Sequence, residues 1–136
     1  MAEKTFDARR DQLDDVLAFV TGQLEQLDCP AKKQMQIEIA VEELFVNIAS
    51  YAYAPGTGTA TVAVDLVPGP RAVEITFTDH GVPYDPLAKP DPDVTLPAED
   101  RSIGGLGIYM VKKSMDAMRY RYENGQNILT ISRLLD

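Results

Sequence analysis

The sequence has almost no cysteine or histidine and no tryptophan. Cys29 is the only cysteine and His80 the only histidine of the 136 residues. A disulfide within the chain is therefore excluded. Cys29 lies in "LDCPAKK", which has the composition of a turn between two helices, and it is far from His80 in sequence. We therefore interpret Cys29 as a packing residue and not as a nucleophile.

Basic residues and long apolar runs are also scarce. The chain has 13 Lys and Arg against 21 Asp and Glu, which gives a net charge of −8 and a pI near 4.6. Direct binding to nucleic acid or to an anionic membrane needs clustered Lys and Arg, so we expect neither partner. Any phosphate-containing ligand should therefore be a small molecule, with its negative charge neutralised by a metal ion. Since no apolar run has transmembrane length and none follows a basic N-terminal segment, we expect a cytoplasmic protein.

The chain has the length and the apolar content of one compact domain. With 136 residues, 45% of them hydrophobic, it can bury a core, and we expect a single domain over residues 1–136. Apolar residues at three- and four-residue steps predict an amphipathic helix over 7–27, which a short strand "EKTFD" precedes. A second, longer helix is predicted over 31–53, where "APGTGT" follows and ends it.

The period of the apolar residues then changes from helix to strand. "TATVAVDLV" and "AVEITFTD" alternate as half-buried strands do, with "PGPR" as the turn between them. A helix from about Leu106 to Met115 precedes "AMRYRYE" and "NILTISRLL", two strands around an Asn124-Gly125 hairpin turn. This order predicts an α+β two-layer sandwich, in which a mixed, mostly antiparallel sheet has helices on one face. We interpret the tyrosines of "YAY" and "RYRY" as packing residues.

A proline-rich connection separates the two halves of the predicted sheet. Five of the nine prolines of the chain fall between Pro83 and Pro97, so this segment cannot be a regular helix or an interior strand. A connection this long inside a compact domain is either disordered or functional, such as a lid over a site.

Two polar residues of the second predicted helix lie in unusual surroundings. Glu43 and Asn47 are one turn apart on the same helical face, and apolar residues flank them on both sides. They either line a pocket or lie at a partly exposed helix edge with an ordinary side-chain hydrogen bond. In a pocket, the Asn oxygen could bind Mg²⁺, and the Glu could orient or deprotonate an attacking hydroxyl.

The sequence contains two further candidates for ligand contacts. Asp79 ends a predicted strand just before Gly81, where its carboxylate could accept a proton from an amine of a base, although it could also be a plain turn former. His80, between them, is expected to face solvent. In "GGLGIYMVKKSMD", glycines stand at the start of a helix, where bare backbone N–H groups and the helix dipole suit a phosphate. A flexible turn before the helix is the alternative.

Three motifs in this order carry a family resemblance. "EELFVN", "DHGVPYDP" and "GGLGIYMVKKSMDAMRY" resemble the N, G1 and G2 boxes of the histidine-kinase-like ATPase superfamily, in its anti-sigma-factor serine-protein-kinase branch. The resemblance covers nearly the whole chain and implies the Bergerat ATPase fold, with an ATP lid over about residues 84–103. Where the wider superfamily has a second G1 glycine, this chain has Pro83.

The resemblance also implies a role for each motif residue. Glu43 would be the general base for a protein hydroxyl, Asn47 would ligate the Mg²⁺ that bridges the nucleotide phosphates, and Asp79 would bind the adenine amine. Gly81 would let its loop approach the base. The phosphate contacts would come from Arg101, Gly104, Gly105, Leu106 and Gly107.

The implied function is that of an ATP-dependent switch protein. With ATP or ADP and Mg²⁺ as cofactors, such a protein phosphorylates a serine or threonine of an anti-anti-sigma partner and sequesters a sigma factor when that partner is unavailable. The resemblance also implies a homodimer. The alternative is a regulatory module that binds nucleotide and controls a partner without phosphoryl transfer. Glu43 discriminates between the two, because a pure binder has no need of it.

Overall fold

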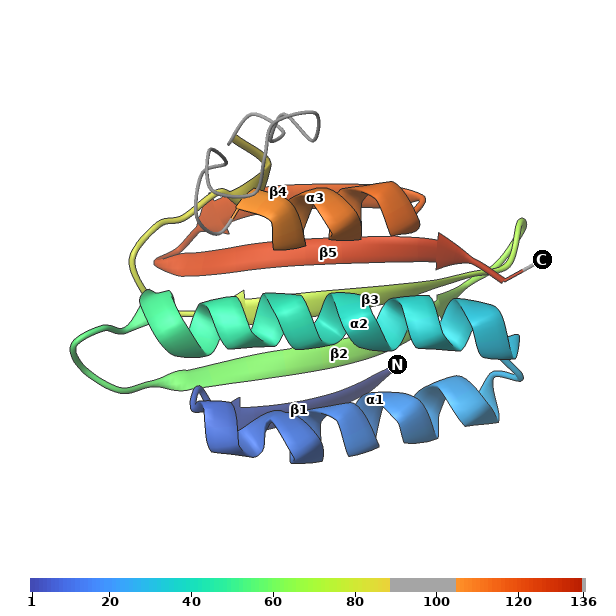
Figure 1. Ribbon diagram of the computed structural model, residues 1–136, viewed down its shortest axis with the longest axis horizontal. Coiled ribbons are helices and arrows are strands. Elements are labelled where there is room, and N and C mark those ends of the chain that lie inside the picture. The colour runs from blue at the N-terminus through green and yellow to red at the C-terminus, as the bar shows by residue number, and fades with distance from the viewer. Residues whose placement is uncertain (89–104, 136) are drawn as a thin grey trace.

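The computed structural model describes residues 1–88 and 105–135, with side chains at all of these except 105 and 106. Three helices cover one face of a five-stranded sheet whose strand order is β1-β2-β3-β5-β4, and α2 lies between α1 and α3 in the helical layer (Figure 1). The strands are β1 (Ala2–Asp7), β2 (Thr59–Val67), β3 (Ala72–Asp79), β4 (Ala117–Glu123) and β5 (Gln126–Leu134). The helices are α1 (Leu13–Gln26), α2 (Ala31–Asn47) and α3 (Gly105–Ser114). The predicted α+β sandwich is confirmed.

Every strand pair in the described part of the chain is antiparallel, so the sheet is not mixed. The β4–β5 hairpin turns at Asn124 and Gly125, whose φ angles of 54° and 75° suit a two-residue turn that matches the twist of the sheet. In the register of β3 and β5, Asp79 faces Asn127. The two residues therefore meet at the end of β3.

Helix α1 begins later than the sequence predicts. The apolar steps predict a helix from residue 7, but Asp7 pairs with Thr59 in the sheet, and the Ala8 N–H donates to the Gly58 carbonyl at 2.9 Å. A short 3₁₀ turn over Arg10–Gln12 then leads into the helix. Sheet pairing thus takes the residues that periodicity assigned to the first helical turn.

Helix α2 buries one apolar stripe and changes its hydrogen bonding at its C-terminal end. Ile37, Val41 and Leu44 are buried. The helix continues beyond Asn47 as a π-helical turn over Ile48–Ala52, a local widening that is frequent at functional sites. The predicted helix over 31–53 is therefore an α-helix followed by a π-helical turn.

The core lies between the helices and the inner face of the sheet. Its largest fully buried side chains include Phe45 of α2, Phe77 and Ile75 of β3, Ile131 of β5 and Val111 of α3. The three described helices all lie on one face of the sheet in Figure 1, and the opposite face bears cross-strand threonine pairs. No described helix has the length and apolar character needed to cross a membrane.

Candidate functional site

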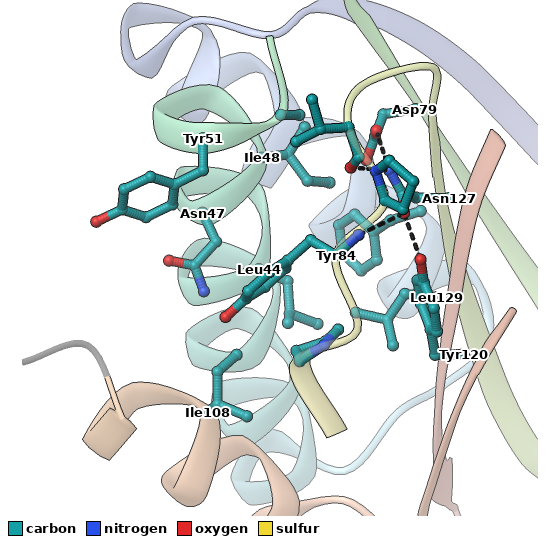
Figure 2. Close-up of a pocket in the computed structure, with 15 residues that line it drawn as sticks. Leu44, Asn47, Ile48, Tyr51, Asp79, Tyr84, Ile108, Tyr120, Asn127 and Leu129 are labelled. Carbon is teal, nitrogen blue, oxygen red and sulfur yellow. Dashed lines mark hydrogen bonds between the residues drawn. The ribbon is translucent and has the colours of Figure 1, made fainter. Parts of the chain in front are cut away.

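A pocket of about 130 Å³ opens where the C-terminal end of α2, the end of β3 and the start of α3 come together. The C-terminal end of α2 and the end of β3 are at the left in Figure 1, and Figure 2 shows the side chains that line the pocket. Most of the walls are apolar, with a few polar groups among them, as is usual for small-molecule sites. The lining residues are Leu44, Asn47, Ile48, Tyr51, Ala52, Phe77, Asp79, Val82, Pro83, Tyr84, Pro86, Ile108, Tyr120, Asn127 and Leu129.

Asp79 presents one carboxylate oxygen to this pocket. Its side chain is only 4% exposed, and Oδ1 accepts hydrogen bonds from the Gly81 N–H and from Asn127 Nδ2, both at 2.9 Å. In the described part of the chain no hydrogen bond is donated to Oδ2, and no fully buried side-chain oxygen there lacks a partner. Oδ2 is therefore not fully buried, and since Asp79 lines the pocket, this oxygen can accept a hydrogen bond from a ligand there. Asp79 is a pocket residue as well as a turn former.

Gly81 is required where the loop after β3 meets the end of α2. A Cβ at this position would collide with the carbonyl of Ala52, and the next residue, Val82, donates its N–H to that carbonyl at 2.9 Å. The close approach in the structure is to protein backbone. Gly81 does not line the pocket, and its approach to a base stays a prediction.

The polar pair of α2 is divided between the pocket and the helix beside it. Asn47 is half-buried and lines the pocket, whereas Glu43, also half-buried, lies one turn earlier and outside the lining. The Glu43 carboxylate packs against Gly107 in the first turn of α3, so closely that a Cβ at Gly107 would overlap Oε1. Glu43 is thus placed beside the N-terminal end of α3, where the helix dipole favours negative charge.

Part of the predicted phosphate site lies at the described start of α3. Gly105 is the first residue of that helix, followed by Leu106 and Gly107. Arg101 and Gly104 lie outside the described residues. The phosphate contacts of all five residues stay predictions.

The predicted ATP lid, about 84–103, is described only as far as residue 88. It starts at Tyr84 and includes a 3₁₀ turn over Pro86–Ala88. Figure 2 shows the Tyr84 ring pointing from this loop toward α2. The beginning of the segment is therefore a wall of the pocket.

Asn127 is a pocket residue that was not among the predicted site residues. It is 6% exposed and donates hydrogen bonds to Asp79 and to the loop that follows. One signal could have found it. Asn127 alternates with the inward-facing Leu129 and Ile131, so the strand pattern places an amide on the core face, where it needs partners. The residue that it faces, Asp79, could not be identified without the strand register.

The packing interpretation of the tyrosines is only partly right. Tyr53 and Tyr120 pack against the core, but Tyr51 is 62% exposed, and both Tyr51 and Tyr120 line the pocket. Burial raises the pKa of the Tyr120 hydroxyl above its usual range, so this group stays protonated and donates to Asn127.

The only histidine and the only cysteine of the sequence, His80 and Cys29, do not line the pocket. His80 is exposed as predicted, and its Nε2 is 3.0 Å from Gln126 Nε2. Cys29 is half-buried against the core, and desolvation raises the pKa of its thiol. A raised pKa disfavours the thiolate, which agrees with a packing role.

The donor set at the pocket fits a cation only together with a ligand. Among the described residues no group of three or more His, Cys, Asp or Glu side chains could hold a metal ion. Asn47 offers a single neutral oxygen. Mg²⁺ commonly takes one or two protein ligands, with phosphate oxygens and water completing its shell. The residues present fit an Mg²⁺ that arrives with phosphates.

The fold and the pocket define a nucleotide-binding ATPase domain, and comparison with known families agrees. The chain belongs to the family described as "Histidine kinase-like ATPase domain", which matches residues 6–133. Among solved structures, the RsbU and RsbW domains of Rv1364c from Mycobacterium tuberculosis resemble it with a TM-score of 0.64 at 16% identity, over 99% of this chain and 33% of that one. At that identity the likeness concerns the fold alone.

Two named relatives carry more sequence similarity. The "Serine/threonine-protein kinase BtrW" of Bordetella bronchiseptica is 28% identical over 102 residues, which are 75% of this chain and 71% of the relative. The "Serine-protein kinase RsbW" of Bacillus cereus is 29% identical over 97 residues, which are 68% of this chain. This chain spans 59% of the length of that kinase.

Proposed function

We propose that this protein binds ATP and ADP in the pocket and transfers the γ-phosphoryl group of ATP to a serine or threonine of an anti-anti-sigma protein. One observation carries the proposal. Asp79 and Asn47 line the same cavity, and the first turn of α3 packs against α2 one turn away from Asn47. The names of the two relatives support the kinase activity.

The Asp79 end of the pocket suits an adenine ring. Oδ2 of Asp79 can accept a hydrogen bond from the exocyclic amine of the base. The surrounding Ile48, Phe77 and Leu129 provide apolar contacts for a flat ring. An apolar slot with a single acceptor at its end binds a base through burial and selects it through one hydrogen bond.

The other end of the pocket suits the phosphates. From the Asp79 end, the nucleotide would extend along α2 toward Asn47 and the N-terminal turn of α3, whose unpaired N–H groups favour an anion. When bound, Mg²⁺ would neutralise phosphate charge, with the amide oxygen of Asn47 among its ligands. Gly105, Leu106 and Gly107 would contribute backbone N–H groups, and Arg101 and Gly104 would complete the phosphate contacts.

Glu43 would act on the attacking hydroxyl. In the transfer, the bond between the γ-phosphorus and the β,γ-bridging oxygen breaks and a bond from the hydroxyl oxygen to that phosphorus forms. The hydroxyl proton passes to the Glu43 carboxylate, and ADP is the leaving group. Such catalysis is mostly positioning and charge stabilisation, so the position of Glu43 beside Gly107 matters as much as its basicity.

The partner proteins follow from the motif resemblance. The antagonist would be an anti-anti-sigma protein, and the unphosphorylated antagonist would compete with a sigma factor for this chain. We propose a cytoplasmic homodimer for this role. Neither nucleic acid nor membrane would be contacted, in keeping with the net charge of −8.

The nucleotide site is tested by calorimetric titration with ATP and ADP, with and without Mg²⁺. We expect binding by the wild type, loss of binding in Asp79→Asn, and loss of the Mg²⁺ dependence in Asn47→Ala. Asp65→Asn is the matched control, because Asp65 is an exposed carboxylate on the adjacent strand β2. A wild-type protein that binds neither nucleotide would contradict the proposal, as would equal binding by Asp79→Asn.

The transfer step is tested with Glu43→Gln, and Glu42→Gln serves as the control because Glu42 is the exposed neighbour on the same helix. Phosphate incorporation from ATP into a candidate anti-anti-sigma protein should be lost only in Glu43→Gln, while both variants still bind ATP. If the wild type binds ATP and the partner but the partner never gains phosphate, the alternative of a regulatory module without phosphoryl transfer holds.

A further inference from the structure

The side chain of Asn127 uses its full hydrogen-bonding capacity at one edge of the pocket. Its Nδ2 donates to Asp79 Oδ1 and to the Val82 carbonyl, both at 2.9 Å. Its Oδ1 accepts from the Tyr84 N–H at 3.1 Å and from the Tyr120 hydroxyl at 2.5 Å. A primary amide has two donor hydrogens and two acceptor lone pairs, so each of the four is occupied.

These four bonds connect three separate segments of the chain. Asp79 is the last residue of β3, Val82 and Tyr84 belong to the loop that follows, and Tyr120 is on β4. Figure 2 shows Asn127 between Asp79, the Tyr84 backbone and the Tyr120 hydroxyl. Asn127 is 6% exposed and lies on β5, the strand that pairs with both β3 and β4. The sheet thus holds the loop through the Asn127 amide, in addition to the bond between the Gly81 N–H and Asp79.

We propose that Asn127, oriented by Tyr120, is a positioning residue that determines which base the pocket accepts. This inference rests on the nucleotide site proposed above. The Asn127 amide holds Asp79 Oδ1, so Oδ2 is the oxygen presented to the ligand. It also fixes the backbone of Tyr84, whose ring points across the pocket toward α2. Asn127 itself has no donor left for the base.

The selectivity follows from the direction of these bonds. With Oδ1 engaged by two N–H donors, Asp79 presents a hydrogen-bond acceptor at the end of the slot. An adenine offers its amine at that point, whereas the corresponding edge of a guanine offers a carbonyl oxygen and would face the carboxylate with like partial charge. If the Asp79 side chain could rotate freely, its carboxylate could turn away from the carbonyl oxygen of a guanine. The repulsion that disfavours guanine would then shrink.

The test uses three variants. Asn127→Asp has the same shape and keeps both acceptor roles, but it cannot donate to Asp79 or Val82 and adds a like charge beside Asp79. Asn127→Leu removes all four bonds with an apolar side chain of similar size. Tyr120→Phe removes one bond, and Tyr122→Phe, an exposed tyrosine on the same strand, is its matched control.

Affinity for ADP and GDP is measured for each variant, with circular dichroism to confirm the fold. We expect the ratio of ADP affinity to GDP affinity to fall by about tenfold or more in Asn127→Asp and Asn127→Leu. In Tyr120→Phe it should fall by about two- to tenfold, the change that corresponds to the loss of one neutral hydrogen bond. Tyr122→Phe should match the wild type. A merely structural role would lower both affinities by one factor, and an unchanged ratio in the Asn127 variants would overturn the proposal.

Hydrogen exchange separates a failure of this inference from a failure of the nucleotide site. In the Asn127 variants the amides of Gly81 and Tyr84 should exchange faster, while amides within the β3–β5 ladder stay protected. This readout needs no ligand. If the wild type binds no nucleotide, the proposed function fails, and unchanged exchange at Tyr84 would show that Asn127 does not hold the loop either.

Discussion

Three glycines differ in the atoms that a side chain at their position would contact. A Cβ at Gly81 would meet the backbone carbonyl of Ala52, one at Gly107 would meet the end of the flexible Glu43 side chain, and one at Gly22 would have no atom within 4 Å. Backbone in a packed turn cannot move aside, whereas a carboxylate can take another rotamer. The three alanine substitutions should therefore have three different outcomes.

Gly81→Ala should destabilise the protein and abolish nucleotide binding. The clash with Ala52 forces the loop away from the end of α2, and overpacking of this kind costs about 1–3 kcal/mol. Urea denaturation and ADP titration measure the two effects. Gly22→Ala, inside α1, is the control and should instead stabilise by about 0.5–1 kcal/mol. Gly81→Ala with wild-type stability would mean that the loop has another accessible path.

Gly107→Ala should impair phosphoryl transfer without unfolding the protein. The new methyl group displaces the Glu43 carboxylate, and misplacement of a catalytic group by about 1 Å can cost about 100-fold in rate. Rates of transfer to the partner protein and urea denaturation provide the measurements. In a Glu43→Gln background the same substitution should add little, because the displaced group is already inactive. A full additional loss there would show that Gly107 acts through other contacts.

Sequence reasoning identified residues whose chemistry is local and missed those whose role depends on pairing. Asn47 stands out because its neighbours in sequence are apolar, and Asp79 because it ends a predicted strand just before Gly81. The structure places both residues in the pocket. Asn127 looks like an ordinary strand residue until the register sets it opposite Asp79. The limit is physical, because alternation specifies the face of a strand but not the residue across from it.

At the scale of secondary structure, the bounds predicted for strands were better than those for helices. The segments "TATVAVDLV" and "AVEITFTD" coincide with β2 and β3, because Pro and Gly residues punctuate both ends of this hairpin. The start of α1 was wrong by several residues, since the pairing of Asp7 with Thr59 overrides helical periodicity. Where no Pro, Gly or capping residue marks the end of an element, tertiary pairing determines it.

The connection from α3 to β4 is fastened to β5 by an ion pair that makes stability depend on pH. Asp116 accepts hydrogen bonds from Arg133 at 2.8 Å and from the Leu134 N–H at 2.7 Å. These bonds hold the pKa of the Asp116 carboxyl below its usual range. Because the folded pKa is the lower one, the stabilisation is present above the unfolded pKa and is lost as the pH falls through the folded value.

Asp116→Asn should therefore lose stability at neutral pH and lose less of it in acid. Urea denaturation at pH 7 and at about pH 3, below the unfolded pKa of an aspartate, compares the two proteins. The difference in unfolding free energy between wild type and variant should shrink in acid. Asp65 has a loose 3.9 Å contact with the N-terminal amine as its one ion pair among the described residues, so Asp65→Asn should give a small difference at both pH values. A difference for Asp116→Asn that stays constant would remove the ion pair as its cause.

For the molecule as a whole, the pocket lies where the helical layer and the sheet end together. In Figure 1 the end of β3 and the C-terminal end of α2 are at the same end of the molecule, and the α1–α2 turn with Cys29 is at the other. The sheet fixes Asp79 and Asn127, and the helices carry Asn47 and Glu43. A bound nucleotide would contact both layers and should hold them together.

Mg²⁺ should bind to this molecule only with a nucleotide. The chain is acidic overall, but its described part has no cluster of three ligating side chains, and Asn47 contributes one neutral oxygen. Calorimetric titration with MgCl₂ should show no specific binding to the free protein and clear binding in the presence of ATP. Saturable Mg²⁺ binding without nucleotide, abolished by Asn47→Ala, would indicate a resident metal site.

The pairing of Asp79 with Asn127 connects ligand recognition to the correctness of the fold. A one-residue slip between β3 and β5 would send alternate side chains to the wrong face and separate these two residues. Only chains in the native register could then bind the base, and binding would draw misregistered chains back to the native state by mass action. Nucleotide would in this way select for the native strand register. On a column of immobilised adenine nucleotide, correctly folded molecules would be retained and misfolded ones would not.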